Sequence, residues 1–201
     1  MLANIAVLIL GVLVFLYIFW KRLKEDYVPE IIFKTAFCVL VGVFVSNILS
    51  NKFFPGWFLW FSFLGTLVGL TFGIFVYKVR FYEALEALVI SFLPWVSLLF
   101  LSDSVVHYSL SSFIGFIAIL VIIFISFWIN DHYKNFSWYK SGKIGFAGLA
   151  TLAIIFLIRS AIAISGIHVL SFVGQRYEAM VSGSLAFISC LLIYNLGRNQ
   201  K

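Results

Sequence analysis

The sequence predicts an all-α protein, a bundle of seven helices that crosses a membrane. Of the 201 residues, 63% are hydrophobic and only 11% are charged, whereas a typical soluble domain is about 45–50% apolar and about 25% charged. The mean hydropathy is +1.10. Apolar runs of about twenty residues, the length that a helix needs to cross a bilayer, follow one another with short gaps. We therefore expect residues 1–201 to form a single integral-membrane domain.

Seven apolar runs are long enough to be spanning helices. The gaps between them are short, and the longest clearly polar one is Asn130–Lys143, so no soluble domain fits between two helices. The predicted spans are Leu2–Trp20, Ile31–Ser50, Phe53–Tyr77, Glu83–Leu101, Tyr108–Ile129, Ile144–Ser165 and Met180–Leu196.

The basic residues divide unevenly between the two sides that seven spans would create. One side holds only Lys52 and Arg176 outside the helices. Because cytoplasmic loops carry the excess of Lys and Arg, we expect a cytoplasmic C-terminus and an N-terminus outside. This pattern explains the net charge of +6 without a nucleic-acid partner. The basic side holds Lys21, Arg22, Lys24, Lys78, Arg80, Lys134, Lys140, Lys143, Arg198 and Lys201.

Three glycines in the third predicted helix, Gly65, Gly69 and Gly73, repeat every four residues and share one face. Such a ridge of small residues allows a neighbouring helix to approach closely. Cys38 and Cys190 lie within apolar runs and form no CxxC pair, which is typical of buried free thiols. The sequence has no Gly-rich phosphate loop, metal-ligand spacing or nucleophile elbow. We therefore expect neither a metal nor a cofactor.

Arg159 is a fixed charge inside the sixth predicted helix. A central arginine costs roughly 2.5–3.5 kcal/mol on membrane-insertion scales, so it needs a partner inside the protein or a water-filled cavity. It follows Ile144 by fifteen residues, which places it about 22 Å up the helix, in the outer half of the bilayer. An arginine at this depth could bind a phosphate or a carboxylate.

Two further polar residues, Asp103 and His107, fall on the same outer side, in the gap after the fourth predicted helix. If they converge with Arg159 on one cavity, His107 could move a proton near neutral pH. Structural alternatives remain for each residue. Asp103 could be a loop or helix-cap residue, His107 could be solvated, and Arg159 could pair with Asp103 and hold two helices together.

The order of these features resembles the bacterial prolipoprotein diacylglyceryl transferases, from about Leu13 to Arg198. The segment GWFLWFSFLG from Gly56 is similar to the family's Gly-x-x-x-His-Gly-Gly-x-x-Gly, with Trp60 at the His position. Phe100 stands at the position of a signature Arg, and His107 with Ser109 is similar to a His-Pro-Ser motif. The sixth helix keeps a Gly followed fourteen residues later by Arg159.

The resemblance implies a protein of the bacterial cytoplasmic membrane that acts on phosphatidylglycerol at the outer leaflet. Family members transfer its diacylglyceryl group to the lipobox cysteine of a prolipoprotein, whose signal peptide would be the second partner. It further implies that Arg159 binds the lipid phosphate, that His107 is the catalytic base and that Asp103 orients one of them. The Trp60 and Phe100 replacements favour an alternative, a non-catalytic lipid-binding or scaffold protein with the same fold. A small transporter is a third possibility.

Overall fold

The computed structural model describes residues 2–132, 145–166, 172 and 174–198, and within these residues it contains seven α-helices and one short 3-10 turn. Each α-helix is long and apolar enough to cross a membrane, which confirms the seven predicted spans. The helices are α1 (Leu2–Leu23), α2 (Pro29–Phe53), α3 (Phe58–Tyr77), α4 (Phe81–His107), α5 (Leu110–His132), α6 (Phe146–Ile164) and α7 (Gln175–Arg198), and the 3-10 turn η1 (Pro55–Trp57) precedes α3.

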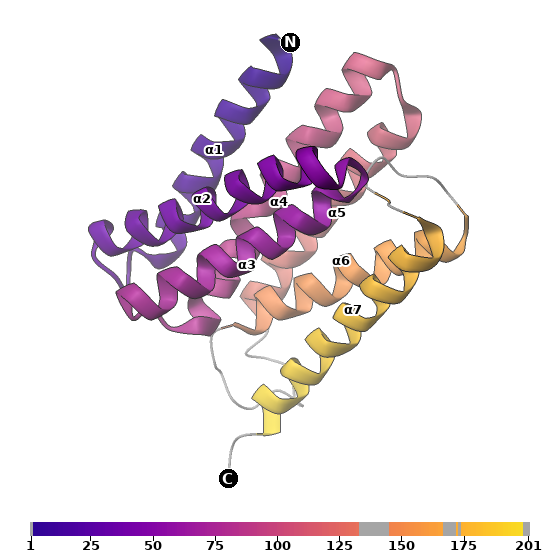
Figure 1. Cartoon of the computed structure of the whole chain (residues 1–201). Coiled ribbons are helices and arrows are strands. Elements are labelled where there is room, and N and C mark those ends of the chain that lie inside the picture. The colour runs from indigo at the N-terminus through magenta and orange to yellow at the C-terminus, as the bar shows by residue number, and fades with distance from the viewer. Residues whose placement is uncertain (1, 133–144, 167–171, 173, 199–201) are drawn as a thin grey trace.

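The helices pack mainly as antiparallel neighbours (Figure 1). The α2 and α3 helices form one hairpin and α6 and α7 form another, while α4 packs against α1, α5 and α6. Consequently α4 is the most buried helix, and its residues from Glu83 to Ile90 are buried without interruption. In a bundle, a helix surrounded on several sides is apolar or internally paired around most of its circumference.

Two ends of the bundle can be distinguished. One, here called the basic end, holds Arg22 at the end of α1, Glu86 near the start of α4 and Asn130 near the end of α5. The opposite one, here called the far end, holds the last turns of α4 and α6 and the first turns of α3 and α7. The start of α1 and the end of α7 lie at opposite ends of the bundle (Figure 1).

The main hydrophobic core lies around α1, α4 and α6, and buried residues of α2 and α3 belong to it as well. Phe15 and Phe19 of α1 are fully buried, and they pack with Ala84 and Leu88 of α4 and Leu149 of α6. A second, smaller cluster extends from the far end towards the middle of the bundle, and it contains Trp60 in the first turn of α3, Phe156 of α6 and Ala186 of α7. This second cluster brings α3 into contact with the α6–α7 hairpin.

The glycine ridge of α3 faces α2. A Cβ atom built on Gly65 would lie 2.3 Å from the Gly42 carbonyl oxygen, and one on Gly69 would lie 2.4 Å from the Cys38 carbonyl oxygen. A Cβ on Gly73 would lie 2.9 Å from the Thr35 side chain. The ridge therefore serves the close helix approach that small residues permit.

The observed boundaries differ from the predicted ones where polar residues continue a helix. Asp103 and His107 belong to the last turns of α4 rather than to a gap, and Tyr108 ends that helix in a left-handed conformation (φ 49°). The α7 helix begins at Gln175, five residues before the predicted Met180, so Glu178 lies in its first turn. Hydropathy misses such turns, although Gln, Arg, Glu and Ala all favour helix.

Candidate functional site

The central contact of the far end is an ion pair between Arg159 on α6 and Glu178 on α7. The Glu178 side chain is completely buried, whereas that of Arg159 is 14% exposed. Ser160, next to Arg159, donates a hydrogen bond to the Ala179 carbonyl oxygen at 3.0 Å and so fixes the two helices in register. Each buried charge thus has an opposite charge beside it, which offsets much of the cost of desolvation.

The Glu178 carboxylate accepts hydrogen bonds from side chains of three helices, α3, α6 and α7. Trp60 of α3 donates its indole N–H to Oε2 at 3.1 Å. Ser182, one turn further along α7, donates its hydroxyl to Oε1 at 3.2 Å, and Arg159 donates to the same oxygen. Because both carboxylate oxygens are bonded, the charge can remain in an apolar environment.

Aromatic rings flank the Arg159 guanidinium. Its central carbon lies 5.8 Å from the centre of the Trp60 ring and 5.1 Å from that of Phe172, within the range of cation–π attraction. Trp60 in turn stacks on Phe156, with ring centres 6.2 Å apart and planes at 8°. Trp60 therefore touches both members of the ion pair, through its N–H and through its face.

The acidic partner of Arg159, Glu178, precedes the predicted start of the seventh span at Met180. The sequence left two arrangements open for Arg159, convergence with Asp103 and His107 or a pair with Asp103. The structure pairs it with Glu178. The sequence contains a signal for this pairing, because Glu178, Ser182 and Ala186 are spaced four residues apart. On a helix that begins before Met180, this spacing puts the carboxylate on the buried face.

Asp103 and His107 do lie together, on the last two turns of α4. His107 Nδ1 is 2.9 Å from Asp103 Oδ1, and the Ser112 hydroxyl of α5 donates to Asp103 Oδ2. The Asp103 side chain is 13% exposed and that of His107 is 69% exposed. When Nδ1 carries the proton, the carboxylate holds the ring in that tautomer and Nε2 is the proton acceptor.

The bulky side chains of Trp60 and Phe100 both make internal contacts. Trp60 bonds Glu178, and the Phe100 ring on α4 packs against Gly115 of α5, where a Cβ would lie 2.8 Å from it. Both side chains fill space between helices.

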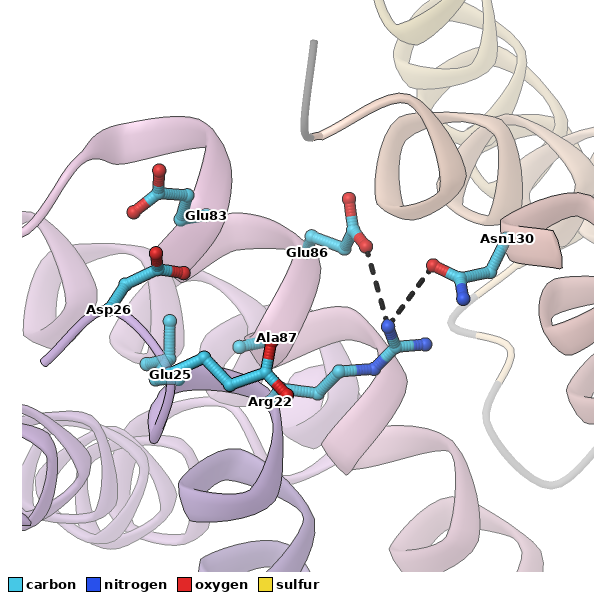
Figure 2. Close-up of a pocket in the computed structure, with 8 residues that line it drawn as sticks. Arg22, Glu25, Asp26, Glu83, Glu86, Ala87 and Asn130 are labelled. Carbon is cyan, nitrogen blue, oxygen red and sulfur yellow. Dashed lines mark hydrogen bonds and ion pairs between the residues drawn. The ribbon is translucent and has the colours of Figure 1, made fainter. Parts of the chain in front are cut away.

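A second polar cluster joins four helices at the basic end (Figure 2). Arg22 reaches between Glu86 Oε1, at 3.7 Å, and Asn130 Oδ1, at 3.1 Å. The other oxygen of Glu86 accepts the backbone N–H of Gly145 at 2.6 Å, just before α6. A cavity of about 170 Å³ lies beside these contacts, with Glu25 and Asp26 on its wall. The cluster ties the ends of α1, α4, α5 and α6 together.

Comparison with known proteins identifies no relative of this chain. No protein-family model, no curated protein and no solved structure matches it. Within the described residues, no three His, Cys, Asp or Glu side chains are grouped so that they could hold a metal ion.

Proposed function

We propose that this protein is a non-catalytic, lipid-binding protein of the bacterial cytoplasmic membrane, on a scaffold that resembles the prolipoprotein diacylglyceryl transferases. The observation that carries the proposal is Arg159, a partly exposed fixed cation near the far end of the bundle. A guanidinium has five N–H donors in a fork that matches a phosphate group. Its ligand would be the headgroup of an anionic phospholipid, with phosphatidylglycerol as the first candidate.

The charge pattern supports an orientation with the basic end in the cytoplasm. In this orientation the far end lies at the outer leaflet, and Arg159 is five residues, about 7.5 Å, below the end of α6. Arginine side chains extend from such a depth towards the interface while their stems stay in the apolar region. The guanidinium would then lie at the level where lipid phosphates begin.

The non-catalytic part of the proposal is supported by how the far-end side chains are used. Arg159 is paired with Glu178, and Trp60 and Phe100 fill positions where the similar family has reactive polar groups. Asp103 and His107 bond each other on α4, while Arg159 bonds Glu178 on α7. The cationic group and the candidate base thus have separate partners on separate helix pairs.

Lipid binding at Arg159 predicts that the two members of the ion pair have opposite effects on lipid retention. We expect Arg159→Gln to lower the phosphatidylglycerol that co-purifies with the protein severalfold. Glu178→Gln should raise it, because the carboxylate no longer neutralises the guanidinium. Native mass spectrometry of the protein extracted from phosphatidylglycerol-containing membranes measures both effects.

The matched control is Arg176→Gln, which removes an exposed positive charge from the same first turn of α7. It should leave the retained lipid unchanged if the effect belongs to Arg159 rather than to net charge. Equal retention in Arg159→Gln, Glu178→Gln and the unaltered protein would exclude a headgroup at Arg159.

Transferase activity is the second candidate, and the His107–Asp103 bond favours it. In that reaction the cysteine thiol of a prolipoprotein signal peptide gives its proton to His107 Nε2. The sulfur then forms a bond to a glycerol carbon of the lipid, and the bond from that carbon to the phosphate oxygen breaks. The test mixes the protein with phosphatidylglycerol and a lipobox peptide. Our proposal expects no mass gain on the peptide thiol. A mass gain in the unaltered protein that disappears in His107→Gln would overturn the non-catalytic proposal and establish transferase activity.

A further inference from the structure

The α3 helix and the α6–α7 hairpin meet through side chains at the far end, while their backbones remain apart. The α3 helix pairs closely with α2, and α6 pairs closely with α7. Between these hairpins, Trp60 stacks on Phe156 and packs with Ala186, and Phe63 meets the edge of the Phe156 ring. The hydrogen bond from Trp60 to Glu178 crosses the same boundary.

The basic end of the bundle is joined differently. There the Arg22–Asn130 and Glu86–Gly145 contacts link α1, α4, α5 and the start of α6, and the large core of Phe15 and Phe19 lies behind them. The α6 helix also packs along α4 and α5. The α6–α7 hairpin is thus anchored through α6. Separating it from α3 would break the contacts of Trp60 with Phe156 and Ala186, and those of the apolar side chains packed around them, Leu59, Phe63, Leu152 and Leu185.

We propose that Trp60 and Glu178 form a latch that holds α3 against the α6–α7 hairpin and covers Arg159 from the α3 side. In the closed state described here, the Trp60 ring lies over the guanidinium and its N–H satisfies the buried carboxylate. When the latch opens, Arg159 becomes accessible between α3 and α7. We infer that an anionic lipid headgroup then reaches Arg159, and this part rests on the proposed function. The latch itself does not depend on it.

The latch depends on a hydrogen bond to a charged group inside an apolar cluster. Trp60→Phe removes the N–H donor and keeps an aromatic ring for Phe156. Hydrogen bonds to charged groups are stronger than neutral ones, so this loss should shift the ratio of closed to open molecules by roughly tenfold or more. Glu178→Gln weakens the same bond from the acceptor side and provides a second, independent variant.

The test measures the distance between α3 and α7 in the full chain. Spin labels are placed on cysteines at Leu64 and Met180, two far-end positions whose side chains are exposed (56% and 70%), after Cys38 and Cys190 have been changed to serine. Pulsed electron paramagnetic resonance then gives the distance distribution in phosphatidylcholine vesicles. We expect one short distance in the unaltered protein, and a second, longer population in Trp60→Phe and in Glu178→Gln.

The control variant is Trp57→Phe, an exposed tryptophan at the end of η1 that should leave the distribution unchanged. An unchanged distribution in both Trp60→Phe and Glu178→Gln would overturn the latch. Adding phosphatidylglycerol to the vesicles should enlarge the longer population further. If the variants open but phosphatidylglycerol has no effect, the latch stands and lipid binding at Arg159 is what fails.

Discussion

Replacing Glu178 with alanine should lower the free energy of unfolding by about 3–5 kcal/mol, the usual cost of removing one partner from a buried ion pair. The change removes the carboxylate that pairs with the Arg159 guanidinium inside the bundle. It also leaves the Trp60 N–H and the Ser182 hydroxyl without their acceptor. Unfolding of the purified protein in mixed micelles by added sodium dodecyl sulfate, followed by circular dichroism, measures the loss.

Two comparisons separate the lost ion pair from other effects of the substitution. Adding Arg159→Met to Glu178→Ala should restore most of the stability, because the double variant buries no unpaired charge. Glu30→Ala removes another carboxylate, which pairs with Lys34 at 2.6 Å but is 75% exposed. We expect a much smaller change there, because solvent screens an exposed ion pair. A Glu178→Ala variant as stable as the Glu30→Ala variant would contradict a buried pair.

The fold was predictable because it depends on the length and composition of whole segments. A backbone in a bilayer must satisfy its own hydrogen bonds, so an apolar run of sufficient length becomes a helix whatever its detailed sequence. The ridge of Gly65, Gly69 and Gly73 likewise predicted close packing, since the absence of a side chain has the same consequence wherever the helix lies.

The candidate site was harder to predict because it depends on specific contacts between side chains that lie far apart in the sequence. The requirement that Arg159 have a partner follows from the cost of its charge, but a sequence does not say which acid comes within reach. Glu178 falls outside the predicted seventh span because the first turn of α7 is polar, and hydropathy therefore starts the helix later. The same effect moved Asp103 and His107 from a presumed gap onto α4, where one turn of helix brings them together.

Trp60 shows how one side chain can connect several helices. In the structure the indole joins three helices, because its N–H reaches Glu178 and its faces meet Phe156 and Arg159. Tryptophan is suited to this role since it combines a large apolar surface with one donor.

Introducing a side chain at Gly65 should be at least as disruptive as losing Glu178. A Cβ at this position would lie 2.3 Å from the Gly42 carbonyl oxygen and 2.1 Å from the Ser46 hydroxyl. The first of these is a backbone atom, so no rotamer change relieves the clash, and α2 must move away from α3. Overpacking a core usually costs about 1–3 kcal/mol. We expect Gly65→Leu to exceed this range, and the thermal midpoint in detergent together with the yield of monodisperse protein measures the effect.

A graded series of alanine substitutions tests the same explanation with the smallest possible change. Gly65→Ala should be the most destabilising, because it meets backbone of α2. Gly73→Ala should cost less, since its Cβ comes closest, at 2.9 Å, to a Thr35 methyl group that can shift. Gly56→Ala, with nothing within 4 Å, should cost least. If the three thermal midpoints fall in another order, close contact between the α2 and α3 backbones is not the reason why these positions require glycine. The order of the three midpoints therefore tests whether the glycines of the α3 ridge are there for helix packing.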